Sequence, residues 1–404
     1  MLFRRLLFIS ALTLAGLAGP LRAADNEALE KRFREANAKV DAGDFQPALE
    51  IYNEILEVEP KAGNVWVMRA IAKWKLKDLS GARADLAQAI ALHPDNIDAY
   101  RVRGQMRYEA KDYANSLADF TKAIDQLKSN VSAIVAAGRQ DEAGAYEKQN
   151  AELFGMRAEV EKQLNDNPSA IYDLTHAIEL KPDYTAALYL RGQLYEAGEE
   201  AAAAEEDYSK VIALNPKHAD ALCNRAWIRF HALKWDDAIA DGKNALEIAP
   251  KAAVALRVVG YSQFAKGDYA EAASTLAAAA DADPDSGAAY ALFVRHYALL
   301  RSGAAMDKRL ATSWGNWKDA PWLQVLAKFI TGQIDEDALE AAAKDTPDGG
   351  ELAGRTCEMH FYIGLARKQA GDKSTARLRF QSALKTEQKT FVEDALSSAE
   401  LKRL

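Results

Sequence analysis

The fold is decided by a pattern of 34 residues that recurs along the chain. Residues 185–218 read TAALYLRGQLYEAGEEAAAAEEDYSKVIALNPKH, and residues 219–252 read ADALCNRAWIRFHALKWDDAIADGKNALEIAPKA. Six of the eleven prolines keep the same spacing of 34 within two blocks, namely Pro60 and Pro94, then Pro182, Pro216, Pro250 and Pro284. A fixed period of this length indicates one array of structural repeats in place of two or three globular domains.

Aligning the repeats with these prolines at position 32 brings small residues together at two other positions. Position 8 holds Ala36, Ala70, Gly104, Ala158, Gly192, Ala226 and Gly260. Position 20 holds Ala48, Ala82, Ser116, Ala170, Ala204, Ala238 and Ala272. Small side chains at a fixed spacing let two amphipathic helices cross closely, and a larger one there would overpack the crossing by roughly 1–3 kcal/mol. We therefore expect two helices in each repeat, with the proline ending the second one.

This pattern resembles the tetratricopeptide repeat (TPR), and the match covers about residues 29–286. The resemblance implies an all-α fold, a right-handed α-solenoid of tandem helix hairpins, over residues 25–303. We expect repeats at 29–62, 63–96, 97–130, 151–184, 185–218, 219–252 and 253–286, and a partial one at 287–303. Residues 131–150 are expected as an insert, and residues 304–404 as a helical C-terminal cap outside the repeats.

Arginine and aspartate recur together in the middle repeats. Position 7 is Arg69, Arg103, Arg157, Arg191 and Arg225 in repeats two to six, and position 23 is Asp85, Asp119, Asp173, Asp207 and Asp241. Repeats one and seven lack both partners. A half-buried guanidinium without its carboxylate would cost several kcal/mol, on the order of 3–5. We therefore predict an ion pair between the two helices of each repeat; the alternative is a ladder of arginines for an anionic ligand.

The N-terminus has the three parts of a secretory signal. Residues 1–24 read MLFRRLLFISALTLAGLAGPLRAA, with two arginines, an apolar run and small residues at Ala23 and Ala24. The uncharged stretch is shorter than the ~20 residues that span a bilayer. We expect cleavage after Ala23 or Ala24, a location in the periplasm, and no membrane span in the mature chain, with a retained anchor as the alternative. Removing the three arginines of this segment changes the net charge from −8 to −11.

Composition and motifs exclude several classes of function. Acidic residues outnumber basic ones, 59 to 51, which disfavours binding to nucleic acid. The two cysteines, Cys223 and Cys357, rule out a disulfide scaffold and a CxxC zinc site, and we expect both thiols to be free. No phosphate loop, zinc helix or nucleophile elbow occurs, and the six histidines have no metal-ligand spacing. We therefore expect a protein that is not an enzyme and holds no cofactor or metal.

A stripe of side chains on the first helices is the candidate partner-binding site. Positions 2, 5, 9 and 12 share one helix face, which in TPR proteins lines the concave surface. The candidates in this stripe are Trp74, Arg101, Tyr108, Tyr189, Trp227, Phe230, Arg257, Tyr261 and Phe264. Tyr, Trp and Arg dominate binding hot spots in protein interfaces. In the alternative interpretation, long loops or the Trp-rich C-terminal segment fill this groove from within.

The C-terminal part combines a Trp-rich segment with one more hairpin. Trp314, Trp317 and Trp322 either plug the end of the repeat core or form a docking surface. Residues 360–384 repeat the small-residue offsets, and residues 391–404 form an amphipathic capping helix. The segments FITGQI (329–334), HFYIGLARKQAGDKSTARLRFQSAL (360–384) and FVEDALSSAEL (391–401) resemble the C-terminal region of NlpI-type envelope TPR proteins.

The NlpI resemblance implies an envelope adaptor that docks proteases and peptidoglycan hydrolases, and a homodimer as in the best-known member. The chain departs from that type because it lacks the lipid-accepting cysteine and has more repeats. We expect a scaffold that binds other proteins or peptides in the periplasm. The alternatives are a TPR subunit of an exopolysaccharide or secretion complex, and a hydrolase or ligand-binding protein with its site in the C-terminal segment.

Overall fold

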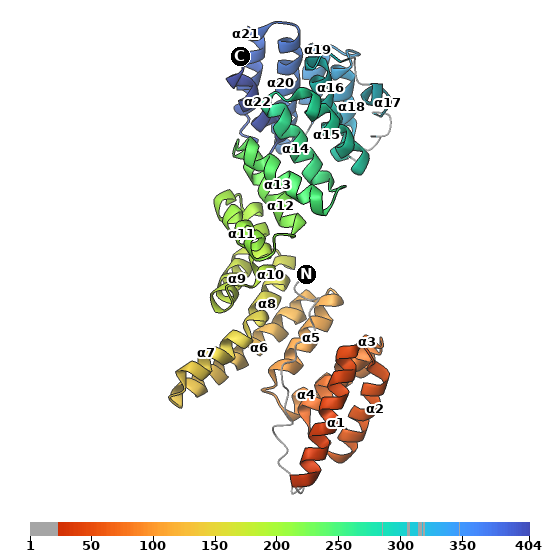
Figure 1. Ribbon diagram of the computed structural model, residues 1–404, viewed down its shortest axis with the longest axis vertical. Coiled ribbons are helices and arrows are strands. Elements are labelled where there is room, and N and C mark those ends of the chain that lie inside the picture. Colours follow the sequence, from red (N-terminus) through yellow and green to blue (C-terminus); the bar gives the residue numbers. More distant parts are fainter. Residues whose placement is uncertain (1–22, 285, 305–307, 314–316, 318–319, 347) are drawn as a thin grey trace. The chain divides into compact units, whose positions relative to one another are not determined.

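The computed structural model describes residues 23–284, 286–304, 308–313, 317, 320–346 and 348–404. All regular secondary structure within these residues is helical, and the helices follow one another as antiparallel pairs (Figure 1). The expected signal peptide lies outside the described residues except for Ala23 and Ala24, which begin the first helix. In the part of the chain that is described, no helix has both the length and the hydropathy needed to cross a bilayer.

The repeats form the helix pairs that the proline spacing predicts. The pairs are α1 (Ala23–Ala42) with α2 (Phe45–Val58), α3 (Gly63–Lys75) with α4 (Leu79–Leu92), α5 (Ile97–Glu109) with α6 (Tyr113–Ala136), α8 (Ala151–Gln163) with α9 (Asn167–Leu180), α12 (Ala219–His231) with α13 (Trp235–Ile248), and α14 (Ala253–Lys266) with α15 (Tyr269–Ala282). The repeat at 185–218 also forms two helices, α10 (Thr185–Ala197) and α11 (Ala201–Leu214). From α3 to α14, each first helix begins at the first residue of its expected repeat. The prediction of an all-α array of tandem hairpins is confirmed.

Small residues lie where the two helices of a pair cross. The alanines at positions 8 and 20 are fully buried. A Cβ atom added to Gly260 would lie 2.6 Å from the side chain of Leu276, and one added to Gly364 would lie 2.7 Å from the ring of Phe380. These distances are below van der Waals contact, so the crossings have no room for a larger side chain.

The turn between the helices of a pair has one conformation throughout the array. Position 15 of every repeat adopts a positive φ, from 59° at Lys111 to 96° at Gly267. Only the first and last repeats have glycine there, and five others have Lys77, Lys111, Asn165, Glu199 or Leu233. The left-handed residue closes the first helix, because its N–H reaches back to the carbonyls of the last turn.

The insert between the third and fourth repeats continues a helix and adds a second one. Helix α6 runs on to Ala136, and Gly138, with φ of 75°, reverses the chain into α7 (Gln140–Gln149). The inserted residues 131–150 therefore extend the array sideways as a helical hairpin and leave the next helix pair intact.

The contacts divide the chain into two compact units, one up to Glu199 and one from Glu200 onward. The second unit contains α11 to α15 and the C-terminal helices, which are α16 (Ser286–Arg301), α17 (Lys308–Ser313), α18 (Pro321–Ile330), α19 (Glu336–Lys344), α20 (Gly349–Gln369), α21 (Lys373–Leu384) and α22 (Val392–Lys402). The expected boundary at residue 303 does not coincide with this division, because Phe293 of α16 packs on Tyr362 of α20, with ring centroids 5.6 Å apart.

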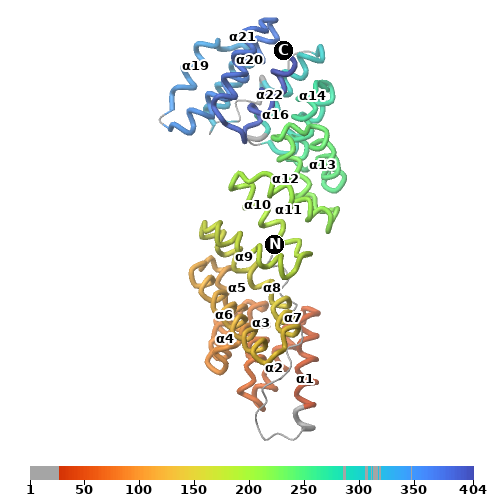
Figure 2. Tube along the Cα trace, turned by 90° about the vertical axis from the view of Figure 1, so that its left-hand side faces the viewer, coloured from red at the N-terminus to blue at the C-terminus, as the bar shows by residue number. Residues whose placement is uncertain are grey.

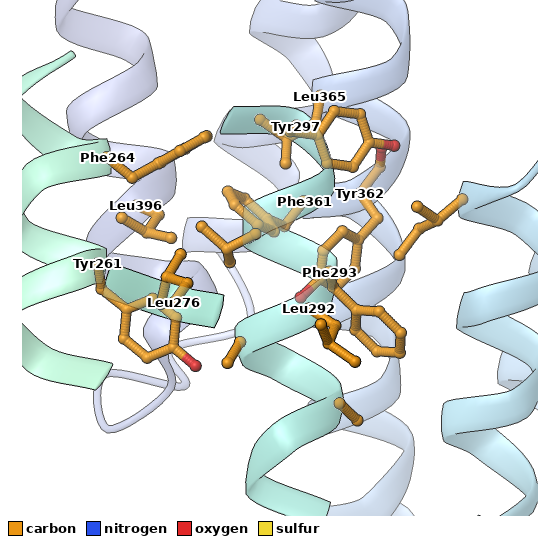
Figure 3. Close-up of a cluster of buried hydrophobic side chains, with 14 of the residues drawn as sticks. Tyr261, Phe264, Leu276, Leu292, Phe293, Tyr297, Phe361, Tyr362, Leu365 and Leu396 are labelled. Atoms are coloured by element: carbon orange, nitrogen blue, oxygen red, sulfur yellow. The ribbon is translucent and has the colours of Figure 1, made fainter. Parts of the chain in front are cut away.

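One hydrophobic core joins the C-terminal helices to the last repeats. Figure 3 shows side chains of α14, α16, α20 and α22 meeting in this core, among them Tyr261, Phe293, Tyr362 and Leu396. Helix α22 lies between α20 and α14 (Figure 2). Residues 304–404 are thus an integral part of the second unit, and α22 covers first helices of the array.

Candidate functional site

The arginines at position 7 make ion pairs inside their own repeats. The nitrogen to oxygen distances are 2.8 Å for Arg69 with Asp85, 2.7 Å for Arg103 with Asp119, 2.6 Å for Arg157 with Asp173 and 2.7 Å for Arg225 with Asp241. All four carboxylates are buried. These four predicted pairs are confirmed, and the pair of Arg191 with Asp207 stays a prediction.

Two of these arginines, Arg69 and Arg225, also reach back to the preceding repeat, which the sequence reasoning missed. Arg69 donates to the side-chain oxygen of Asn53 at 2.8 Å, and Arg225 donates to Ser209 Oγ at 3.0 Å. Both acceptors stand at position 25 of the repeat before. Because these two guanidinium groups each bind side chains of two repeats, Arg69 and Arg225 hold neighbouring repeats together. The arrangement favours the structural interpretation over a ladder for an anionic ligand.

In the first unit, the candidate stripe is partly exposed. Arg101 forms an ion pair with Asp98 at 2.7 Å and is half-buried. Tyr108 packs on Tyr113 with ring centroids 5.5 Å apart, and its hydroxyl donates to Glu159 at 3.4 Å. Burial and the nearby Glu159 raise the pKa of Tyr108. Tyr189 is also half-buried.

Trp74 departs from the expected exposure, since its side chain is only 5% exposed and belongs to the core of the first unit. In the second unit the same correction applies to Phe230, Tyr261 and Phe264, which are fully buried. The physical reason is α22, which packs across α12 and α14 and covers their stripe. The covering segment is thus the capping helix, in place of the loops or Trp-rich segment considered above.

Trp227 and Arg257 remain accessible at the edge of this covered stripe. Trp227 stacks on Phe230 with centroids 5.8 Å apart, and Arg257 forms an ion pair with Asp283 at 2.6 Å. The binding role of the five half-buried stripe residues stays a prediction; they are Arg101, Tyr108, Tyr189, Trp227 and Arg257.

A pocket of about 270 Å³ opens where α22 meets the stripe of the second unit. Its apolar wall comes from Trp227, Tyr261, Tyr290, Phe391 and Val392, and its charged groups are Arg257, Glu358 and Glu393. Gly354 leaves space for the ring of Phe391, which a Cβ atom would approach to 3.1 Å. The pocket therefore joins three stripe residues of the repeats, Trp227, Arg257 and Tyr261, to residues that the C-terminal helices supply.

Two buried carboxylates face this pocket. The hydroxyl of Tyr290 donates to Glu358 Oε1 at 2.7 Å, and the indole N–H of Trp322 donates to the other oxygen. The hydroxyl of Tyr362 donates to Glu393 Oε1 at 2.9 Å. Burial, followed by the charge of Glu358, raises the pKa of Glu393 to about 8, and burial raises that of Glu358. Neither carboxylate forms an ion pair with a cation of the described residues.

A third buried carboxylate, Glu400, lies further along the same helix in contrasting surroundings. Its oxygens accept hydrogen bonds from Arg301 at 2.6 Å and Lys368 at 2.7 Å, and Arg403 forms an ion pair with it at 3.2 Å. Burial alone would raise its pKa, but these cations outweigh burial and lower it. The sequence contained a signal for the burial of Glu393 and Glu400, because their spacing places both on the same helix face as Leu396.

The tryptophans and cysteines pack in the interior. Trp317 is buried against Phe293, with ring centroids 5.7 Å apart, and Trp322 is half-buried, while Trp314 lies outside the described residues. These contacts favour the plug over the docking surface. Cys223 and Cys357 are free and buried, as expected, and burial raises their pKa values to about 11 and about 12. The thiols are therefore poor nucleophiles near neutral pH.

The comparisons agree with the repeat pattern. The family model described as tetratricopeptide repeat matches residues 33–84, 67–131, 156–219, 195–253 and 223–287. Tetratricopeptide repeat protein 13 of Homo sapiens is 36% identical over 102 residues, which are 25% of this chain and 12% of that protein. Small glutamine-rich tetratricopeptide repeat-containing protein 2 of Mycosarcoma maydis is 32% identical over 141 residues, which are 35% of each chain.

Among solved structures, the C-terminal part of a TPR repeat-containing protein from Cytophaga hutchinsonii is 17% identical, with a TM-score of 0.49. The match covers 64% of this chain and 99% of that one. The alignments with the two curated relatives span 35% or less of those proteins. Because the matches to the family model together take in more than half of the residues, the chain belongs to the tetratricopeptide repeat family.

Proposed function

We propose that this protein is a non-enzymatic adaptor of the bacterial periplasm that binds other proteins through the stripe on its first helices. TPR proteins are protein-interaction scaffolds and generally not enzymes. The observation that carries the proposal is that five Tyr, Trp and Arg side chains of the stripe, three in the first unit and two in the second, are only half-buried, so part of each is accessible to a partner. Such side chains bury a large area on binding and have few rotors to immobilise.

The periplasmic location is supported by the sequence of the N-terminus. A charged start, an apolar run and small residues at Ala23 and Ala24 fit a cleavable signal. Mass spectrometry of the protein purified from the producing cells tests it: a mature chain that starts at Ala24 or Asp25, recovered in the periplasmic fraction, supports the proposal. Recovery of the intact Met1 terminus in the cytoplasm would refute it.

The finer role, an NlpI-like adaptor in envelope or peptidoglycan maintenance, rests on the resemblance of the C-terminal region. Two of the segments that carry this resemblance, residues 360–384 and 391–401, lie in the hairpin of α20 and α21 and in the closing helix α22. A homodimer is part of the proposal, and sedimentation of the mature chain tests it. Partners drawn from an exopolysaccharide or secretion complex would favour the alternative scaffold role.

The binding role of the stripe is tested by comparing a tyrosine inside the stripe with an exposed tyrosine outside it. Tyr189 lies in the stripe of α10, whereas Tyr172 of α9 is 73% exposed outside the stripe. We expect Tyr189→Ala combined with Trp227→Ala to lose a cross-linked envelope partner that the wild type captures. The matched variant Tyr172→Ala should retain it, because only an exposed side chain outside the stripe is changed. Identical partner sets for all three proteins would refute the stripe as the binding site.

A further inference from the structure

The pocket at the start of α22 has an unbalanced charge. Glu358 and Glu393 are 4% and 2% exposed, and the donors that reach them are neutral: two tyrosine hydroxyls and one indole N–H. Burying a carboxylate is costly unless a cation or a proton compensates it. No such cation comes from the described residues. The compensation must therefore come from bound protons or from a group that enters the pocket.

The only arginine in the pocket wall is occupied elsewhere. Arg257 forms an ion pair with Asp283 at 2.6 Å, so its charge is largely balanced at the rim. Arg355, the next cation near Glu358, donates to Glu351 and to the backbone carbonyl of Asp345. Burial raises the pKa of Glu358 and the charge of Arg355 lowers it by less, but neither arginine forms an ion pair with Glu358 or Glu393.

The apolar part of the wall suits an alkyl cation. Trp227, Tyr261, Tyr290 and Phe391 present aromatic rings to the same space as the two carboxylates. A cation over an aromatic face gains about 0.5–2 kcal/mol, the larger value where water is excluded, and carboxylates at the end of the space hold the charged head. The volume of about 270 Å³ lies just below the range of small-molecule sites, roughly 300–1,000 Å³, and fits one side chain.

We propose that this pocket binds one lysine or arginine side chain of a partner protein. The proposal rests on the scaffold function above and names the chemistry of its partner. Trp227 and Arg257 belong both to the stripe and to the pocket, so a chain lying along the stripe of the second unit passes the pocket mouth. The net charge of −8 also favours a basic partner.

The protonation of the empty pocket gives the proposal a second readout. Burial and Glu358 raise the pKa of Glu393 to about 8, so the empty pocket retains a proton near neutral pH. An entering cation favours the ionised carboxylate and releases that proton. Calorimetric titrations in two buffers of different ionisation heat should therefore give different apparent binding enthalpies at pH 7.

The direct test uses three tripeptides with blocked ends, Gly-Lys-Gly, Gly-Arg-Gly and Gly-norleucine-Gly, titrated into the full mature protein. We expect at least one cationic peptide to bind about tenfold or more tightly than the neutral one, a difference of ~1.4 kcal/mol. Comparing the affinities of the lysine and arginine peptides shows whether the pocket prefers an ammonium or a guanidinium group. Equal affinity of all three peptides, or no binding at about 1 mM, would refute the proposal.

Isosteric variants assign the preference to the two carboxylates. Glu393→Gln and Glu358→Gln should each reduce the preference for the cationic peptide about tenfold. Asp394→Asn is the matched control, because it also removes one acid from the first turn of α22 but does not line the pocket. Should a glutamine variant fail to fold, the comparison of peptides on the wild type still decides the question.

Failure of this inference can be told apart from failure of the adaptor function. If the stripe variants lose a partner while the three tripeptides bind the wild type alike, the adaptor stands and the cation pocket is refuted. If the cationic preference holds while no envelope partner depends on the stripe, the pocket stands as a site for a free organic cation, and its assignment to a partner protein is overturned.

Discussion

The two ends of α22 place the same residue type in opposite electrostatic surroundings. Glu393 in its first turn and Glu400 in its last are 2% and 0% exposed. Glu400 forms ion pairs with three cations, Arg301, Lys368 and Arg403. Glu393 accepts from the hydroxyl of Tyr362 and lies near the carboxylate of Glu358. As a result the pKa of Glu400 is lowered, and the pKa of Glu393 is raised to about 8.

The difference shows that burial alone does not reveal what a carboxylate does. At the C-terminal end of α22 the charges balance. There the ion pairs of Glu400 with Arg301 and Lys368 connect α22 to α16 and α20. At the N-terminal end the charges do not balance, so Glu393 contributes less to the stability of the fold than its burial suggests. A strongly perturbed acid in a pocket is a candidate for binding, whereas a balanced one is a structural contact.

The largest effect is expected from removing the balanced charge. Glu400→Gln leaves Arg301, whose side chain is 8% exposed, without its carboxylate, and should lower the free energy of unfolding by about 3–5 kcal/mol. The same substitution at Glu393 keeps an oxygen for Tyr362 and removes a like charge, so it should be neutral or stabilising at pH 8. Urea unfolding of both variants measures the difference, and equal losses would break the comparison.

A carboxylate in the repeats extends the comparison to the first unit. Asp173 is 1% exposed and binds Arg157 at 2.6 Å, which resembles the surroundings of Glu400. Asp173→Ala should lower the free energy of unfolding by about 3 kcal/mol, with little change in partner binding. Glu179→Ala on the same helix is the control, because the Glu179 side chain is 70% exposed. An unchanged melting temperature for the Asp173 variant would show that water replaces the lost partner.

The repeats could be predicted from the sequence because each feature occurs several times. Small residues at positions 8 and 20, and Arg with Asp at positions 7 and 23, were found by comparing repeats. The acceptors at position 25 were missed because Asn53, Thr175 and Ser209 are chemically different. A common hydrogen-bonding role is not visible when the residue type changes from one repeat to the next.

The surroundings of α22 were not predicted, since this helix occurs once and its partners are far away in sequence. Arg403 donates to Tyr269, which lies in the seventh repeat. Such a contact has no periodic signature, so the burial of Tyr261 and Phe264 beneath α22 could not be foreseen. The sequence predicts an amphipathic capping helix at 391–404, but not that Glu393 and Glu400 lie on its buried face with Leu396.

Helix α20 contacts both ends of α22, because its Glu358 lies near Glu393 and its Lys368 forms an ion pair with Glu400. The packing of α20 should therefore affect the surroundings of both acids. Gly364→Ala places a methyl group 2.7 Å from the buried ring of Phe380 and should cost about 2 kcal/mol of unfolding free energy. Gly144→Ala is the control, because no atom lies within 4 Å of its added Cβ and alanine favours the helix. Equal stabilities of the two variants would show that the crossing of α20 with α21 is loose.

The smallest effect is a dependence of stability on pH, which has opposite signs at the two ends of α22. The folded-state pKa of Glu393, about 8, lies above its ordinary value of 4.5, so the native state binds more protons between these values. The contribution of Glu393 to the stability therefore falls as the pH rises from about 5 to 8. Glu400 has the opposite sign, since its lowered pKa gives stability that is lost only as the pH falls below its ordinary value. The titratable and charged groups near Glu393 are Glu358, Tyr362, Tyr261, Tyr290, Cys357 and Arg257. Urea unfolding at pH 5.5 and pH 8 should show wild type losing at least about 1.4 kcal/mol relative to Glu393→Gln, the equivalent of one pKa unit. Parallel curves for the two proteins would mean that the pocket acid titrates as if exposed, and the contrast between the two ends of α22 would then be one of geometry without charge.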